Sequence, residues 1–92
     1  SAGDAEKMGM IYSAVADEDL NEIALNTAKK LAKMPTLGLA LTKQALNSSM
    51  NNDLTAQLQV EDDLQTVAGR SVDYNEGVSA FLEKRKPVFV GK

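Results

Sequence analysis

SVDYNEGVSAFLEKRKP, residues 71–87, carries the start, the apolar stripe and the stop of one helix. Asp73 and Glu76 have the spacing of a capping box, with Asp in the usual place of Ser or Thr. The apolar residues recur at helical spacing and are Tyr74, Val78, Phe81 and Leu82. Positive charge at 84–86 suits the negative end of the helix dipole, and Pro87 cannot continue the helix. The stretch therefore predicts an amphipathic helix that begins near 71–73 and ends in a basic turn.

Three further helices are expected before this one, and two of them have clear signals at both ends. Asp17 is the expected N-cap of the first, and Pro35 ends it because the residue before a proline is pushed out of the helical region. Another begins at Asn52 or Asp53 and closes near Gly69, a residue type that favours helix C-termini.

The helix between them is expected over residues 37–50, with Thr36 as its cap and the asparagines at 51–52 as its break. Its first turns hold few polar residues. A helix that is apolar nearly all round is usually buried on several sides. We therefore expect partner subunits or a larger body to cover residues 37–50.

The start of the chain is less regular. Residues 3–8 are compatible with a short helix that Gly9 closes. Met10–Val15 is short, apolar and partly β-branched, and it predicts either a strand or an extended link. The expected fold class is all-α with three to four amphipathic helices, divided into residues 1–16 and a helical domain over 17–92.

Composition excludes several classes of function. The 92 residues make one domain at most, and 43% of them are apolar, enough for a folded chain. There is no His and no Cys, which excludes histidine-based triads, thiol nucleophiles, disulfides and imidazole or thiolate metal sites. The net charge of −3 argues against general nucleic-acid binding. No membrane span or signal peptide is recognisable, and the lack of Cys fits the cytoplasm.

Two candidate sites emerge from the residues. Glu61 is the one carboxylate expected on an apolar helix face, where it would act as a general base or, as we favour, as a structural carboxylate paired with Arg70 or a backbone amide. Its neighbours Asp62 and Asp63 are expected on a solvated face. Phe81 and Lys84 are one turn apart beside a basic terminus, a pattern suited to an anionic, partly aromatic ligand; a core Phe and an ordinary helix-end charge are the alternatives.

One pattern spans the last helix and the tail: Asp73-x-x-Glu76-Gly77-Val78-x-Ala80-Phe81-Leu82-x-Lys84-Arg85-x-Pro87-x-Phe89. It resembles the terminal signature of the crotonase (enoyl-CoA hydratase/isomerase) family. Earlier segments agree in order and spacing, namely Met8-Gly9-Met10-Ile11, Leu31-Ala32-x-Met34-Pro35 and Leu41-Thr42-Lys43-Gln44-Ala45-Leu46. Met10-Ile11-Tyr12 and Ala68-Gly69-Arg70-Ser71-x-Asp73-Tyr74 are similar to a branch of the family that isomerises a ring epoxide in phenylacetate degradation.

The resemblance implies a crotonase fold, in which a spiral of ββα units precedes a helical domain used in trimer formation. The spiral carries the oxyanion-hole amides and the acid/base carboxylates and is absent here. We therefore expect residues 17–92 to be the helical C-terminal domain and residues 1–16 the end of the core. No catalytic residue is expected within this chain, and the chain alone is expected to be inactive.

The family also implies ligand and partner contacts. Residues matching Phe81 and Lys84 contact coenzyme A, often that bound in a neighbouring subunit, and the substrate is a coenzyme A thioester handled without a metal or another cofactor. The expected partners are acyl-CoA and further copies of the chain, as a trimer or a dimer of trimers, with neither nucleic acid nor membrane. The alternatives are a free-standing helical oligomerisation domain that associates through residues 37–50, and a compact enzyme with Glu61 as its base.

Overall fold

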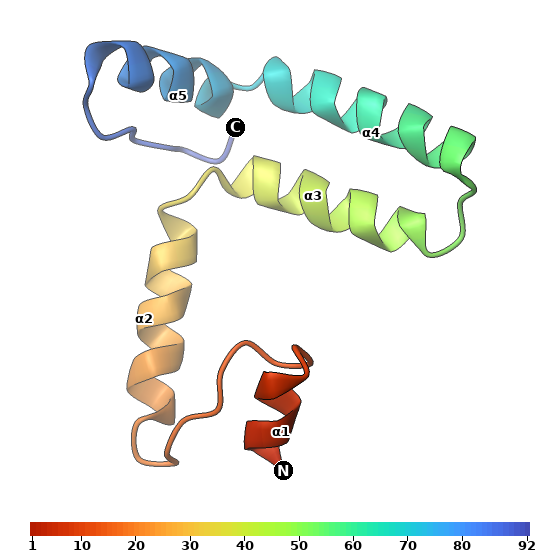
Figure 1. Ribbon diagram of the computed structural model, residues 1–92. Coiled ribbons are helices and arrows are strands. Elements are labelled where there is room, and N and C mark those ends of the chain that lie inside the picture. The colour runs from red at the N-terminus through yellow and green to blue at the C-terminus, as the bar shows by residue number, and fades with distance from the viewer.

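The computed structural model describes residues 1–92 as five helices without a strand (Figure 1). The helices are α1 (Ala2–Lys7), α2 (Leu20–Ala32), α3 (Thr36–Ser49), α4 (Leu54–Gly69) and α5 (Val72–Glu83). Helices α3 and α4 form an antiparallel hairpin, α5 follows α4 after a short turn, and α2 points away from the hairpin at the start of α3. The tail, residues 86–92, runs back along α5 toward the start of α3. The all-α prediction is confirmed, with the expected short helix and four longer ones.

The α3–α4 hairpin follows from a repeat of partly buried residues on both helices. These positions are 37, 38, 41, 45 and 48 in α3 and 57, 60, 64 and 68 in α4. Spacings of three and four put each set on one face of its helix. Gln57 ties the faces together, because its amide nitrogen donates to the Ala45 carbonyl at 3.1 Å and its amide oxygen accepts from Asn52 at 3.1 Å. Asp53 caps α4 by accepting from the Ala56 amide at 2.8 Å, which confirms one of the two predicted starts.

Two predicted caps are wrong by one or two residues. Asp17 lies in a turn, and Asp19 is the residue at the N-cap of α2. Thr36 is the first residue of α3, and Pro35 is its N-cap because the Pro35 carbonyl accepts the first helical hydrogen bond from Leu39 at 3.1 Å. Where several neighbouring residues all favour a helix start, the sequence does not determine which of them is the N-cap, and the direction of the preceding chain decides it.

Gly9 closes α1 as predicted. Its φ is +73°, and the Gly9 and Met10 amides donate to the carbonyls of Glu6 and Ala5, both at 2.9 Å. This pair of bonds is a Schellman motif, which favours Gly at the left-handed position. Residues 10–16 then form a link and no strand, so the link alternative of the two predicted is the one observed.

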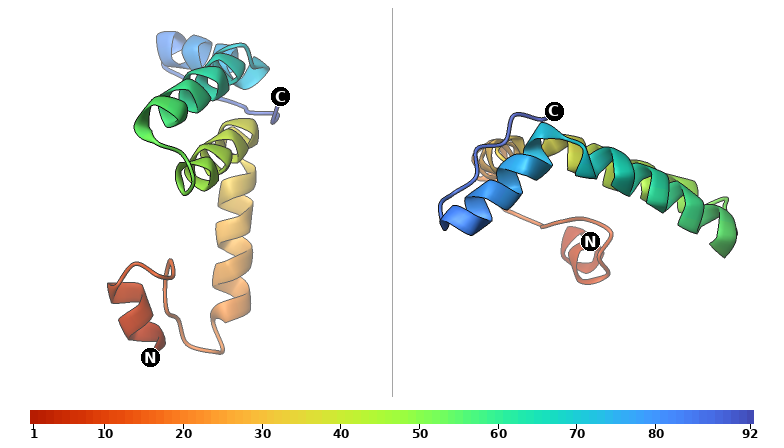
Figure 2. Two further views of the ribbon diagram at one scale, coloured as in Figure 1. Left: turned by 90° about the vertical axis from the view of Figure 1, so that its right-hand side faces the viewer. Right: turned by 90° about the horizontal axis from the view of Figure 1, so that it is seen from above.

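The chain is open, and its helices are spread apart in both views of Figure 2. Most of its large apolar side chains remain accessible. Only Asp73 and Ala80 are buried. The accessible surface is 7507 Å² for 9.9 kDa, whereas a compact monomer of this mass exposes about 5200 Å². The radius of gyration is 16.9 Å against about 12 Å for a compact chain of this length. Within this chain only α4 covers α3, and Leu46 and Met50 are 65% and 82% exposed, so the burial expected for residues 37–50 would have to come from outside it.

None of the five helices combines the length and apolarity that crossing a membrane requires.

Candidate functional site

A cavity of about 440 Å³ lies between the start of α3, the end of α4, helix α5 and the tail. The chain has two Tyr and two Phe, and three of these four aromatic residues line the cavity: Tyr74, Phe81 and Phe89. Apolar concave surfaces with a few polar groups are the usual form of small-molecule sites. The cavity is therefore the first place to look for ligand contacts.

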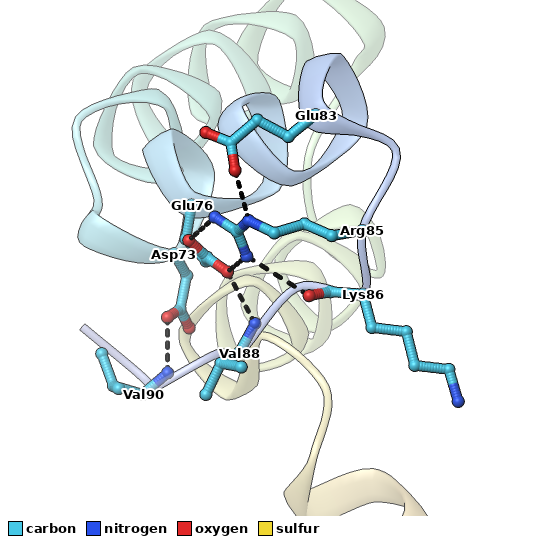
Figure 3. A network of polar contacts seen from close by, with 7 residues as sticks. All are labelled: Asp73, Glu76, Glu83, Arg85, Lys86, Val88 and Val90. Atoms are coloured by element: carbon cyan, nitrogen blue, oxygen red, sulfur yellow. Dashed lines mark hydrogen bonds and ion pairs between the residues drawn. The ribbon is translucent and has the colours of Figure 1, made fainter.

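Asp73 ties the tail to the start of α5 and forms one border of the cavity (Figure 3). The side chain is only 3% exposed, and its carboxylate oxygens accept from the Val90 amide at 2.7 Å and the Gly91 amide at 2.9 Å. The Asp73 amide donates to the Lys92 carbonyl at 3.0 Å. A buried carboxylate must be hydrogen-bonded, and here backbone amides of the tail supply the donors.

The predicted Asp73–Glu76 capping box is wrong. Ser71 is the N-cap of α5, and its hydroxyl accepts from the Tyr74 amide at 2.9 Å. Both acidic residues turn instead to the tail, because the tail after residue 86 has backbone amides that no helix or sheet satisfies. The signal in the sequence was ambiguous, since Ser71 and Asp73 are both good cap residues.

Glu76 holds the other end of the tail through Arg85 (Figure 3). The guanidinium donates to both carboxylate oxygens of Glu76, at 2.6 and 2.9 Å, and the Val88 amide donates to the same carboxylate at 2.7 Å. These bonds, first those from Arg85, lower the pKa of Glu76 from 4.5 to about 2. Arg85 also donates from Nε to Glu83 at 2.6 Å, and its bonds to the two carboxylates raise its pKa. The cluster is a charge-assisted, two-pronged contact of the kind that only Arg makes.

Lys84 lies at the turn that this cluster surrounds, and it is the one non-glycine residue with a left-handed backbone, at φ 54° and ψ 39°. Its amide donates to the Phe81 carbonyl at 3.3 Å, and the Arg85 amide donates to the Ala80 carbonyl at 3.0 Å. The two bonds form a Schellman motif with Lys where Gly is usual. Lys84 thus lies outside α5. The spacing predicted that Phe81 and Lys84 share one face of a helix, and this prediction is wrong because the helix ends at Glu83.

The two predicted ligand contacts still lie at one end of the molecule. Phe81 is in the last turn of α5, borders the cavity and is 83% exposed, so it is not part of a core within this chain. Lys84 follows three residues later and, like Lys86, forms no ion pair. Among the basic residues 84–86, only Arg85 forms ion pairs with carboxylates. An exposed ring and two unpaired ammonium groups therefore occupy the end of α5.

Glu61 is exposed on α4 and accepts a hydrogen bond from the Gln57 side chain at 2.9 Å. Its predicted partners, Arg70 or a backbone amide, are not the observed ones. Glu61 therefore does not lie on a buried apolar face, where a general base was considered. Asp62 and Asp63 are exposed as well, and no group of three or more acidic side chains is close enough to hold a metal ion.

Comparison with known proteins gives matches along the whole chain. The model of the enoyl-CoA hydratase/isomerase family matches residues 1–92. The 1,2-epoxyphenylacetyl-CoA isomerase of Escherichia coli K12 is 54% identical over 92 residues, which are 100% of this chain and 35% of that protein. The 2,3-dehydroadipyl-CoA hydratase of the same organism is 37% identical over 92 residues, again 100% of this chain and 36% of that protein. A crystal structure of an enoyl-CoA hydratase subunit from Geobacillus kaustophilus has a TM-score of 0.92 at 39% identity, over 100% of this chain and 36% of that one. The chain thus spans about a third of the length of the relatives it matches.

Proposed function

The chain belongs to the enoyl-CoA hydratase/isomerase family, and on this premise we propose that it is the helical part of an enzyme that acts on acyl-CoA thioesters. In that enzyme it contributes part of the coenzyme A site and a surface for self-association. The observation that carries the proposal is the family match along all of residues 1–92, together with helices that superpose on a solved family member at a TM-score of 0.92.

For the whole enzyme we propose 1,2-epoxyphenylacetyl-CoA as substrate and its isomerisation as reaction. The E. coli isomerase shares 54% of these residues, against 37% for the dehydroadipyl-CoA hydratase over the same length. The larger identity supports the isomerase branch over the hydratase branch. The groups that transfer protons are proposed to lie outside these 92 residues, because the one buried carboxylate at the cavity, Asp73, has both oxygens bonded to backbone amides of the tail.

Phe81 and Lys84 are the proposed coenzyme A contacts. Coenzyme A has an adenine ring and three phosphates, so it needs an aromatic face and positive charge. Phe81 is 83% exposed, and stacking of a base on such a ring is worth about 1–3 kcal/mol. Lys84 has no carboxylate partner, which leaves its ammonium group free to pair with a phosphate.

The test is a chimera in which this chain replaces the matching segment of the E. coli isomerase, assayed with 1,2-epoxyphenylacetyl-CoA. We expect the folded chimera to be active. A folded chimera without activity would overturn the proposal for the whole enzyme.

The variant Phe81→Leu then tests the contact with coenzyme A, because Leu keeps an apolar side chain but removes the aromatic face. KM for the CoA thioester should rise about tenfold, from the loss of stacking. KM for the corresponding pantetheine thioester, which has no adenosine, should not change. Leu54→Ala, at an exposed apolar residue away from the cavity, is the control. Equal changes for both thioesters would refute the Phe81 contact.

A second candidate is an oligomerisation domain without catalysis, and the open surface favours it. The accessible surface of 7507 Å² exceeds that of a compact monomer by about 2300 Å², an area that obligate interfaces cover. This hypothesis predicts that the 92-residue chain alone forms a discrete oligomer in sedimentation equilibrium, indifferent to coenzyme A. The substitutions Leu46→Lys and Met50→Lys should dissociate the oligomer. Asn47→Lys, at an exposed polar residue between them, should not. A monomeric chain would rule the hypothesis out.

A further inference from the structure

The left-handed backbone of Lys84 needs an explanation in the residues around it. An L-residue in this conformation costs about 1–2 kcal/mol, and such residues persist where the surrounding structure enforces them. Gly would adopt φ 54° without that cost. The surroundings of Lys84 must therefore restrain the chain on both of its sides.

Arg85 supplies the restraint. The residues on either side of Lys84 bond to each other across it, with Arg85 Nε 2.6 Å from a Glu83 carboxylate oxygen. The same guanidinium is fixed to Glu76 by bonds of 2.6 and 2.9 Å, and Glu76 also accepts from the Val88 amide at 2.7 Å (Figure 3). The turn is thus joined to the middle of α5 and to the tail by one side chain.

Most of the N–H groups of Arg85 are already paired. Its Nε bonds Glu83, its Nη2 bonds Glu76, and its Nη1 bonds both Glu76 and the Lys86 carbonyl, the last at 3.3 Å, so that only one N–H, on Nη2, has no partner. To form a two-pronged contact with a phosphate, Arg85 would have to give up its bond to at least one carboxylate. A carboxylate left in this way would stand uncompensated beside the anion and repel it.

We propose that Arg85 is a positioning residue for an anionic ligand: its bridge between Glu76 and Glu83 holds Lys84 in the left-handed turn and neutralises the carboxylates beside it, so that Lys84 and not Arg85 meets the phosphates. The inference rests on the proposed coenzyme A role of Phe81 and Lys84. It gives the basic residues 84–86 two different roles. The guanidinium of Arg85 binds carboxylates within the chain, and the ammonium group of Lys84 binds the ligand.

The experiment is a double-mutant cycle in the active chimera, with KM and kcat measured for the CoA and pantetheine thioesters. Lys84→Gln should raise KM for the CoA thioester about tenfold, the size of one lost charge-assisted hydrogen bond, and leave kcat unchanged. Arg85→Lys keeps the positive charge but not the two-pronged contact, and it should raise the same KM with no change for the pantetheine thioester. The double variant should be no worse than Lys84→Gln alone, because Arg85 acts through Lys84.

Each alternative has its own result. Additive effects of the two substitutions would mean that Arg85 binds the phosphates itself. An Arg85→Lys variant with lower thermal stability but an unchanged ratio of the two KM values would mean a purely structural role. Both results overturn the inference. If Lys84→Gln leaves KM for the CoA thioester unchanged, the proposed role of Lys84 fails first, so the two failures are distinguishable.

Glu83→Gln is the second variant in case Arg85→Lys does not fold. Glu83 is 61% exposed, and its replacement removes only the charge of the bond that spans Lys84. Any effect on folding should therefore be small. We expect a smaller rise of KM for the CoA thioester than in Arg85→Lys. A fall of that KM instead would show that Glu83 acts only by repelling the anion, and would count against the restraint of Lys84.

Discussion

Lys84→Gly should stabilise the protein and weaken its ligand binding at the same time. Lys84 is left-handed at φ 54°, a conformation that costs an L-residue about 1–2 kcal/mol and costs Gly almost nothing. Gly also increases the conformational entropy of the unfolded chain, which lowers the free energy of unfolding by about 0.4–1 kcal/mol. The expected net gain in the free energy of unfolding is about 0.5–1 kcal/mol.

The assay is thermal unfolding of the chimera followed by calorimetry. The 92 residues match 35% of the E. coli isomerase, so the chimera has about 260 residues. At that size 1 kcal/mol shifts Tm by about 2–4 °C, and the expected rise is therefore about 1–4 °C. The matched control is Lys86→Gly, an exposed lysine two residues on without a positive φ, which should give no gain in Tm. KM for the CoA thioester should rise in Lys84→Gly as in Lys84→Gln.

A fall of Tm in Lys84→Gly that equals or exceeds the fall in Lys86→Gly would refute the reasoning. It would mean that the Lys84 side chain contributes more to stability than its backbone conformation costs. A rise of Tm with unchanged KM would leave the strain argument intact and remove the side chain from the ligand site. The two readouts thus separate the conformational claim from the functional one.

Three further predictions concern the tail and α4. The pKa of Glu76 is lowered to about 2, below its usual 4.5, so its contribution to stability is complete above pH 4.5 and is lost as the pH falls from there to about 2. The protection of the tail amides against hydrogen exchange should fall over that range, and Glu76→Gln should remove the part of this pH dependence that is due to Glu76. Gly91→Ala should loosen the tail by more than about 1 kcal/mol, because φ is +77° and the new Cβ would lie 2.6 Å from the Thr36 hydroxyl oxygen, whereas Gly69→Ala, with no atom within 4 Å of the new Cβ, should not lower Tm. Glu61→Gln should leave kcat and KM of the chimera unchanged, since the exposed Gln57 contact is its only hydrogen bond, and a large loss of kcat would revive Glu61 as the catalytic base.

The helices could be predicted from sequence because their signals are local. The starts near Asp53 and Ser71, the stop at Gly9 and the break before Pro35 each depend on residues within about one helical turn. Errors at such positions are small, as with Asp17, where three acidic residues in a row all favour a helix start.

The position of the candidate site residues was predictable in part, and their role as ligand contacts stays a prediction. Phe81 and Lys84 were named from their spacing and from a family resemblance, and the structure has them at one end of α5. The partition of the basic run into one paired Arg and two unpaired Lys was not predictable. It depends on which carboxylate comes within reach when the chain reverses at Lys84, and Glu76 is nine residues from Arg85 in the sequence.

By itself the sequence determined the all-α class, the approximate bounds of the four longer helices and the composition of the basic end of α5, because helix signals act over three or four residues. Only the tertiary structure decided what Asp73 and Glu76 do. Both residues satisfy the local rule for a capping box, yet both bind backbone amides of the tail, up to 18 residues away for Asp73 and Gly91. The amides at the helix start and the amides of the tail compete for the same two carboxylates. The tail amides would otherwise have no hydrogen-bond acceptor, and the path of the tail decides which of them come within reach. The left-handed turn at Lys84 and the cavity beside Phe81 follow from that path.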